Sequence, residues 1–266
     1  MEKIKINAAI ILAAGKNTRF DTGVPKSLHQ LGEYSLLERQ IREFHKAHIF
    51  NIAVVVGYRG HIIKSYLEKL NNLLIIPVEV IENPEFEKSN GYSILAAEKW
   101  IQVQDTDLFL CTMADHVFEE SFYHNFIKKL ENLALVPTRI RPDPCLLNLA
   151  VDLPSEHNAY IDLLDVTRVY AEHKSHHDLC IHKAAKLMDE YNYFDTGFFA
   201  LRKEVFDYLN MLTVEGKDSI TDLVNHLADR QEARAIDMSG FYWNDIDTPE
   251  AFKIVLSQID KLSPKV

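Results

Sequence analysis

Two basic residues follow the first apolar run of the chain at positions that suit the binding of a polyphosphate. Residues 8–12 form a short, continuous apolar run that is typical of a strand buried on both faces, and the run ends at Gly15. Arg19 and Lys26 come after this turn. Backbone N–H groups at a glycine turn, together with Arg and Lys, are the groups that a triphosphate needs. The alternative is a strand that ends in a glycine turn beside surface cations.

Three aspartates lie where they could share one divalent cation. Asp115 follows the apolar run 108–112, and the carboxyl end of a strand is the edge where open α/β sheets bind ligands. Asp245 and Asp247 fall on the same side of an extended segment, because side chains alternate with period two. Two carboxylates on one face repel each other unless a cation joins them, and Mg²⁺ prefers such oxygens. For Asp115 alone, a helix or turn cap is the alternative.

A further set of polar residues is suited to reading a nucleobase. Glu82 ends an apolar run, and Asn90, Gly91, Tyr92 and Ser93 open a helical pattern. Cytosine carries an exocyclic amine beside ring acceptors, whereas uracil reverses two of these positions. Carboxylate or amide oxygens can accept the amine protons. On its own, NGYS is also a turn that leads into a helix cap.

The elements that must position these residues alternate between strand and helix in the first half of the chain. Repeated crossovers of this kind imply a parallel sheet covered by helices on both faces. We expect strands at 8–12, 52–56, 75–81, 108–112 and 133–136, and helices at 35–47, 61–70, 91–100 and 121–131.

The alternating pattern of apolar runs ends at Pro137. Prolines and scattered polar residues up to about 158 then predict a long irregular excursion. Regular structure returns afterwards. We expect strands at 196–201 and 233–237, helices at 203–212 and 219–229, and a closing helix from Pro249. With no internal repeat and no clean linker, we predict a single domain over 1–266.

Composition excludes several classes of protein. The chain has 266 residues, of which 47% are hydrophobic and 26% charged, as in a folded globular protein. The formal net charge of -10 argues against nucleic acid as a partner. The longest apolar run, 8–14, is shorter than the roughly 20 residues of a membrane span, so no membrane insertion is expected. Three cysteines without metal-ligand spacing predict a cytoplasmic location.

The strings LAAGKNTRF (12–20) and PKSL (25–28) resemble the opening motif of the sugar-nucleotide and phospho-alcohol nucleotidyltransferases, LAAG-x-G-T-R followed by P-K. Asn17 stands where that family usually has its second glycine. NGYS resembles the base-reading loop of the cytidylyltransferase branch, particularly the inositol-1-phosphate cytidylyltransferases. MADHVF (113–118) and WNDIDTPE (243–250) resemble the metal segments of the same family.

Two later strings resemble the acceptor side of that family. DTGFF (195–199) is similar to the element beneath the acceptor, and Lys186 matches a lysine nine residues before it. DLLDVTRV (162–169) resembles another acceptor-side segment, so that only about 141–160 falls outside the resemblance. The resemblance implies a Rossmann-like three-layer α/β/α fold with a mixed, mostly parallel sheet. The excursion at about 138–189 would form an acceptor-side insertion or lid.

The resemblance implies a Mg²⁺-dependent cytidylyltransferase that joins CTP to a phosphorylated alcohol, with inositol 1-phosphate as the best match. The products would be pyrophosphate and a CDP-alcohol, a phospholipid precursor. Arg19 and Lys26 would hold the triphosphate, Lys186 would face the acceptor, and Asp115, Asp245 and Asp247 would hold the metal. The nucleotide would be bound by Leu12, Ala13, Ala14, Gly15, Glu82, Asn90, Gly91, Tyr92 and Ser93.

Several alternatives stay open. The acceptor could instead be a phosphonate such as 2-aminoethylphosphonate, phosphocholine or glycerol phosphate. A hexose 1-phosphate uridylyltransferase fits NGYS less well. A non-catalytic nucleotide-binding regulatory module would keep the glycine turn and lose the carboxylates, but all three aspartates are present. The sequence leaves the oligomeric state undecided, with a homodimer among the alternatives.

Overall fold

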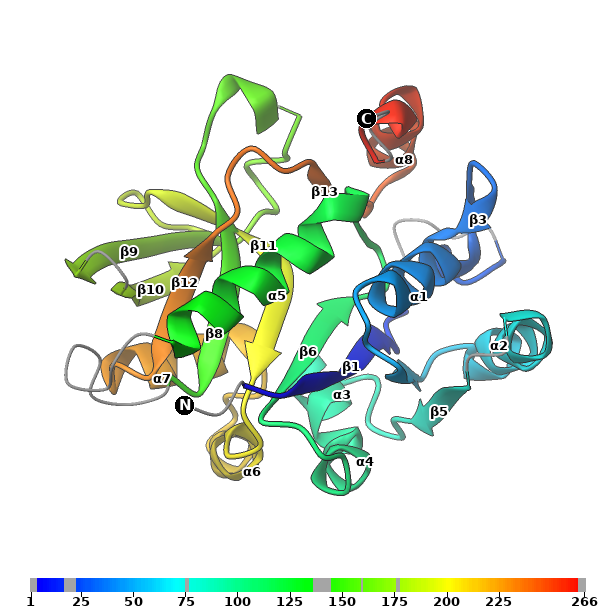
Figure 1. Cartoon of the computed structure of the whole chain (residues 1–266), viewed down its shortest axis with the longest axis horizontal. Coiled ribbons are helices and arrows are strands. Elements are labelled where there is room, and N and C mark those ends of the chain that lie inside the picture. The colour runs from blue at the N-terminus through cyan, green and yellow to red at the C-terminus, as the bar shows by residue number, and fades with distance from the viewer. Residues whose placement is uncertain are drawn as a thin grey trace.

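A computed structural model describes residues 4–16, 23–74, 77–135, 145–158, 160–175 and 178–262 of the chain (Figure 1). Its strands, in chain order, are β1 (Ile6–Ala13), β2 (Gln30–Leu31), β3 (Tyr34–Ser35), β4 (Asn51–Val56), β5 (Val78–Glu82), β6 (Leu108–Met113), β7 (His116–Phe118), β8 (Leu147–Asp152), β9 (Arg168–Ser175), β10 (Asp178–Ala185), β11 (Tyr193–Leu201), β12 (Ala233–Asp237) and β13 (Trp243–Asp245). Its α-helices are α1 (Leu36–Lys46), α2 (Gly60–Leu74), α3 (Asn90–Ala96), α4 (Glu98–Gln102), α5 (Glu120–Ala134), α6 (Val205–Val214), α7 (Ile220–Asp229) and α8 (Pro249–Ser257).

Nine of the strands form one mixed sheet in the order β5-β4-β1-β6-β11-β8-β12-β10-β9. The half made of β5, β4, β1 and β6 is parallel and lies on the right of Figure 1. In the other half, β8 pairs with β12 in parallel, whereas β11 and β10 run antiparallel to their neighbours. The predicted fold class, an α/β nucleotidyltransferase sheet with mixed strand directions, is confirmed, although antiparallel pairs are more frequent than we expected.

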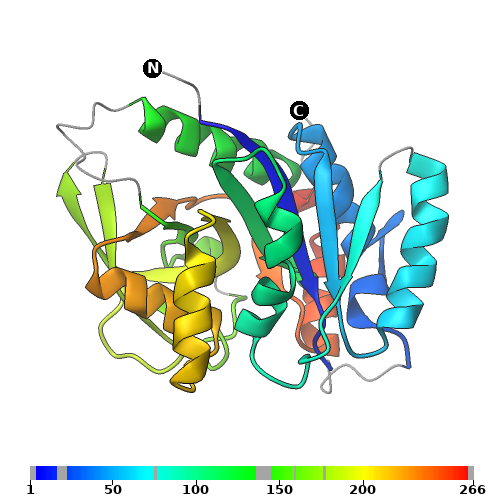
Figure 2. The same cartoon turned by 90° about the horizontal axis from the view of Figure 1, so that it is seen from below.

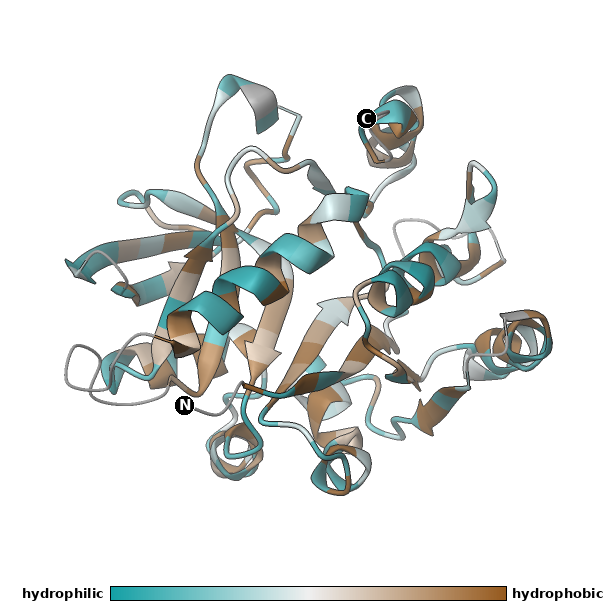
Figure 3. Cartoon of the chain, in the orientation of Figure 1, coloured by the Kyte–Doolittle hydropathy of each residue, from teal (hydrophilic) through white to brown (hydrophobic). Residues whose placement is uncertain are grey.

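The two faces of the sheet are covered by different helices, which explains the continuous apolar runs. In β1, Ala8 and Ile10 pack in one core cluster and Ala9 and Ile11 in another, all of them 0% exposed. The first cluster includes residues of α3, α4, α6 and α7, and the second includes residues of α1, α2 and α5. Figure 2 shows helices against both faces, and Figure 3 shows the apolar strands beneath the hydrophilic outer sides of α1 and α5.

Most predicted elements are present, often with different ends. The predicted helix at 35–47 is α1, and the Ser35 side chain caps it by accepting a hydrogen bond from Glu38 N–H. The predicted helix at 91–100 is divided into α3 and α4 at Ala97. The strand expected at 75–81 begins only at Val78. None of the described helices combines the length and the apolar character needed to cross a bilayer.

Two predictions for the middle of the chain were wrong. The strand expected at 133–136 does not form in its described part, because α5 continues to Ala134 and Leu135 caps it. The irregular excursion expected up to about 158 contains β8, which is buried along its whole length in the centre of the sheet. The strand contains polar residues that made it look irregular in the sequence. Asn148 is buried against β11, and the Asp152 carboxylate accepts a hydrogen bond from Trp243 Nε1 (2.8 Å).

Candidate active site

One cavity lies where β1, β5 and β6 end. Leu12 of β1 pairs with Met113 of β6, so the Gly15 turn and Asp115 are brought to the same edge of the sheet. The cavity has a volume of about 170 Å³. Most of its lining residues are uncharged: Leu12, Ala13, Ala14, Gly15, Ser27, Phe86, Lys88, Asn90, Ser93, Met113, Ala114 and Asp115. We call it the nucleotide-side cavity, because the residues predicted to bind the nucleotide line it.

A larger cavity of about 620 Å³ opens beside it and is rich in carboxylates and hydroxyl groups. Segments far apart in the sequence build it, among them the 161–167 loop, β11, the start of α7 and β13. Its polar lining includes Asp162, Asp165, Thr167, Lys186, Asp195, Ser219, Thr221, Asn244, Asp245 and Asp247. We call it the acceptor-side cavity, because the residues predicted to face the acceptor line it. Asn90, Met113 and Asp115 line both cavities, so the two spaces meet at Asp115.

A buried lysine joins two of the predicted metal ligands. Lys26 is 2% exposed, and its Nζ lies 2.8 Å from Asp115 Oδ2 and 2.6 Å from Asp247 Oδ1. Burial opposes the charge of Lys26, but the two carboxylates outweigh it and raise the pKa of the ammonium group. Burial would also raise the pKa of Asp115, whereas the Lys26 ammonium holds it well below its usual range. The site therefore keeps a cation bound to its carboxylates.

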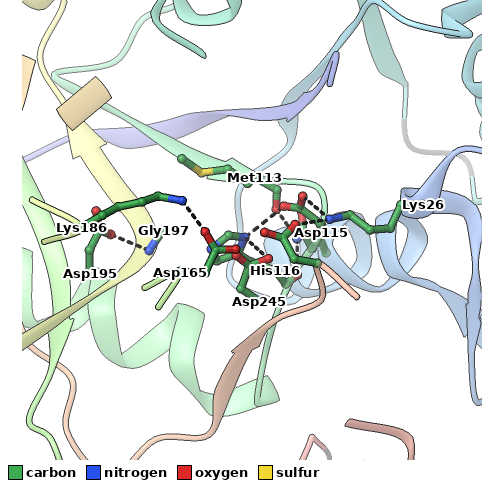
Figure 4. A network of polar contacts seen from close by, with 11 residues as sticks. Lys26, Met113, Asp115, His116, Asp165, Lys186, Asp195, Gly197 and Asp245 are labelled. Carbon is green, nitrogen blue, oxygen red and sulfur yellow. Dashed lines mark hydrogen bonds and ion pairs between the residues drawn. The ribbon is translucent and has the colours of Figure 1, made fainter. Parts of the chain in front are cut away.

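His116 lies on the acceptor side of this ion pair (Figure 4). Its Nδ1 is 3.0 Å from Asp115 Oδ1 and 3.8 Å from Asp245 Oδ1. The neighbouring carboxylates outweigh the effect of burial and raise the pKa of His116 to about 9. Gly197 makes room for the ring: a Cβ atom there would come within 2.5 Å of it, and the backbone φ of +74° also favours glycine. The glycine of DTGFF thus allows a second cation at the site.

The carboxylates fit a hard divalent cation. The oxygen atoms of Asp165, Asp245 and Asp247 lie within 4.8 Å of one another, and Asp245 is likewise close to Asp115 and His116. Asp245 Oδ1 is buried and accepts no hydrogen bond from the described residues, and burial raises the pKa of this carboxyl group. A buried oxygen without a donor is costly unless a cation or ligand reaches it. The Lys26 ammonium already occupies a position between two of these acids.

The segment that we predicted to read the base, Asn90–Ser93, forms the start of α3. Asn90 Oδ1 accepts a hydrogen bond from Ile220 N–H (2.8 Å), which attaches the loop to α7. A Cβ atom at Gly91 would lie 2.3 Å from the Asp218 carbonyl oxygen, so only glycine fits this close approach. Ser93 lines the nucleotide-side cavity, and its Oγ accepts a hydrogen bond from the buried Asn83 Nδ2 (3.0 Å).

Comparisons with known proteins agree with this geometry. Residues 9–185 match the family model of the MobA-like NTP transferase domain. The chain belongs to this family. The match confirms the predicted enzyme class, a nucleotidyltransferase.

Curated relatives of this NTP-transferase chain include two proteins named "Bifunctional IPC transferase and DIPP synthase". The protein from Aquifex aeolicus is 29% identical over 92% of the chain, and the one from Thermococcus kodakarensis is 27% identical over 92%. The matches cover 50% and 49% of those proteins, so the chain spans about half their length.

Solved structures show the same fold. The inositol-1-phosphate CTP transferase from T. maritima superposes with a TM-score of 0.76 at 24% identity, covering 99% of this chain and 100% of that one. A UDP-glucose pyrophosphorylase superposes with a TM-score of 0.74 at 18% identity, covering 96% and 99% of the two chains. Similarity at this level supports the predicted fold.

Within this NTP-transferase fold, most of the predicted site residues lie at the two cavities. Residues 12–15, Asn90 and Ser93 line the nucleotide-side cavity. Asp115, Lys186, Asp245 and Asp247 line the acceptor-side cavity. The Lys186 ammonium forms an ion pair with Asp165 (Figure 4). Gly91 and Tyr92 line neither cavity; Gly91 supports the loop, and Lys88 Nζ lies 4.4 Å from the centre of the Tyr92 ring.

The prediction for Glu82 is not supported by its position. Its side chain is 76% exposed, lines neither cavity, and lies 3.9 Å from Lys64 Nζ. The next residue, Asn83, is buried instead, because side chains alternate at the end of β5. Arg19 and Asn17 lie outside the described residues, so the role predicted for Arg19 stays a prediction.

Sequence reasoning missed three residues that the fold brings to the site. His116 was visible in MADHVF, but nothing local indicated its contacts with two aspartates. Asp165 was visible in DLLDVTRV, yet its closeness to Asp245 depends on β13. Phe86 lines the nucleotide-side cavity because Gly57 lacks a Cβ atom, which would lie 2.3 Å from Phe86 Cβ. Only tertiary contacts show that these three residues lie at the site.

Proposed function

We propose that the chain transfers the cytidylyl group of CTP to a phosphorylated polyol, best matched by inositol 1-phosphate. The observation that carries the proposal is the meeting of the two cavities at Asp115. An oxygen of the acceptor phosphate would attack the α-phosphorus of CTP. The bond from that phosphorus to the oxygen bridging to the β-phosphate would break, and pyrophosphate would leave with the electron pair. The protein needs to supply alignment and charge neutralisation for this step.

The described residues can provide both. The Gly15 turn would approach the phosphates with its backbone, and the Lys26 ammonium, kept charged by Asp115 and Asp247, would neutralise the triphosphate. Lys186 would reduce the repulsion between the acceptor phosphate and the nucleotide. Asp115, Asp245 and Asp247 would hold Mg²⁺, which when bound acts as a Lewis acid on phosphate oxygens. Curated relatives named as IPC transferases support this reaction class.

The acceptor-side cavity favours an alcohol with several hydroxyl groups. Asp162, Asp165 and Asp195 offer hydrogen-bond acceptors, and Thr167 and Thr221 offer hydroxyl groups. A quaternary ammonium group would instead favour aromatic faces. Among the described lining residues, Trp243 is the one large aromatic side chain, and it is 1% exposed. Inositol 1-phosphate therefore suits the lining better than phosphocholine does.

Pyrophosphate release tests the proposal, with CTP, UTP and ATP each paired with inositol 1-phosphate, glycerol phosphate, phosphocholine and 2-aminoethylphosphonate. We expect turnover with CTP, Mg²⁺ and inositol 1-phosphate, and none after addition of EDTA. CTP with Mg²⁺ at about 100 times its dissociation constant should stabilise the fold by roughly 2.7 kcal/mol, and UTP by much less. Equal stabilisation by UTP would contradict the cytidine assignment, and turnover in EDTA would contradict the metal assignment.

A further inference from the structure

The turn that presents Asp115 is held by a side chain from α1. β6 ends at Met113 and β7 begins at His116, so Ala114 and Asp115 form the connection between them. Gln40 is 1% exposed, and its Nε2 donates hydrogen bonds to the carbonyl oxygens of Met113 (2.8 Å) and His116 (2.6 Å). A single amide group therefore joins the two ends of the turn.

The orientation of this amide is fixed by what surrounds it. Both atoms that face it are carbonyl oxygens, which only accept hydrogen bonds, so the NH₂ group must point toward the turn. As a result, Gln40 Oε1 is buried and has no hydrogen-bond partner among the described residues. An unpartnered buried oxygen costs about 1–3 kcal/mol. An apolar side chain at position 40 would avoid this cost, so packing alone does not explain the glutamine.

The other contacts of the turn hold it at one point each. Ala114 N–H donates to the Leu12 carbonyl oxygen (2.9 Å), and Ile246 N–H donates to the Asp115 carbonyl oxygen (3.0 Å). They attach the turn to β1 and to the segment after β13. Of the backbone contacts described for this turn, only those of Gln40 join its first and last residues. The Asp115 carboxylate itself contacts Lys26 and His116, so the Gln40 amide acts on the backbone from which that carboxylate extends.

We propose that Gln40 is a positioning residue that fixes Asp115 for the divalent cation. This inference rests on the proposed function, because it takes Asp115 as a metal ligand. Groups that orient metal ligands without touching the metal typically contribute 10- to 100-fold to metal affinity or activity. Loss of the Gln40 amide should therefore weaken metal binding, although Gln40 contacts neither substrate nor metal.

The test measures Mn²⁺ binding in the presence of CTP without acceptor, by electron paramagnetic resonance, for Gln40→Met and Gln40→Glu. Methionine has a similar length and no donor, and an ionised glutamate would face two carbonyl oxygens. We expect the Mn²⁺ dissociation constant to rise by about 10- to 100-fold, more for Gln40→Glu. The melting temperature of Gln40→Met should fall moderately, because two carbonyl oxygens lose this donor while one unpartnered oxygen is removed.

Glu43→Gln is the matched control. Glu43 lies one turn further along α1, is 3% exposed, and pairs with Lys46 (2.8 Å) away from the turn. Its Mn²⁺ affinity should equal that of the unchanged protein. An unaltered Mn²⁺ affinity in folded Gln40 variants would overturn the inference, as would an equal loss in Glu43→Gln or failure of both Gln40 variants to fold. If the unchanged protein binds Mn²⁺ with CTP but releases no pyrophosphate with any acceptor, the proposed function fails. The Gln40 measurement then still shows whether Gln40 affects the affinity for the metal.

Discussion

The nucleotide-side cavity is lined mainly by uncharged residues, whereas carboxylates and hydroxyl groups are frequent in the lining of the acceptor-side cavity. The first is formed by neighbouring parallel strands and the loops that follow them. The second needs the 161–167 loop, β11, α7 and β13 at once. A triphosphate can be held by backbone N–H groups in a short segment, because its shape and charge are the same in every substrate. An alcohol is recognised by side chains, which the fold must gather from distant segments.

The carboxylates at the junction of the two cavities should have the largest effect. Asp115→Asn removes a charge that is balanced by Lys26 and His116 and is proposed to bind metal, so turnover should fall by roughly 10³-fold. Pyrophosphate release at saturating CTP and acceptor measures this effect, and circular dichroism reports whether the fold is intact. The control is Asp105→Asn, since Asp105 pairs with Lys5 far from the cavities. A loss below tenfold would place the metal elsewhere.

Lys26 tests the binding of CTP: it lines neither cavity and lies between Asp115 and Asp247. A hydrogen bond to a charged group is worth about 1.5–3 kcal/mol, so Lys26→Ala should weaken CTP binding by roughly 10- to 150-fold. Calorimetric titration of CTP with Mg²⁺ measures the affinity without turnover. Lys46→Ala removes a surface lysine of α1 and should leave the affinity unchanged. Unchanged CTP affinity in Lys26→Ala would mean that this lysine serves only to neutralise Asp115 and Asp247.

Asp195 tests whether a buried carboxyl group of the acceptor-side cavity lowers the stability of the fold. Burial raises the pKa of Asp195 to about 6, above the value of about 3.9 expected in the unfolded chain. The folded state therefore binds this proton more tightly, and ionisation lowers the stability of the fold as the pH rises from about 4 to about 6. Asp195→Asn should increase the free energy of unfolding by about 3 kcal/mol at pH 8, and this gain should disappear as the pH falls from 6 to 4.

Urea unfolding of the Asp195 variants at several pH values measures the gain. Asn can still accept the hydrogen bond that Gly197 N–H donates to Asp195 Oδ1 (2.7 Å), whereas Asp195→Ala loses it and should gain less. The same Asp195→Asn variant should use the acceptor less well, since Asp195 lines that cavity. A difference in stability that does not depend on pH would rule out the carboxyl group as its source.

The contrast between the two cavities also explains what the sequence could predict. Gly15, Ser93 and Asp115 stand in short strings directly after strands or at a helix start, so local pattern could single them out, and all three line one cavity. Asp245 and Asp247 were predicted to lie together because of their spacing, and they do. The contact of His116 with Gly197 joins segments about 80 residues apart, and no local pattern encodes it. Strand β8 was missed for a related reason: its buried polar residues are satisfied by partners in other strands and loops.

Lys186 should have the smallest effect, because its side chain is 60% exposed and water screens its charge. Its ion pair with Asp165 nevertheless places the ammonium group at the acceptor-side cavity. Lys186→Ala should lower kcat/KM for the acceptor by about tenfold, equivalent to about 1.4 kcal/mol, and leave CTP affinity unchanged. Steady-state kinetics with varied acceptor at saturating CTP measure this, with Lys183→Ala as the control, since Lys183 is exposed on β10 and lines neither cavity. A change below threefold, or an equal change in the control, would make Lys186 an ordinary surface residue and leave recognition of the acceptor phosphate to His116 and the metal ligands.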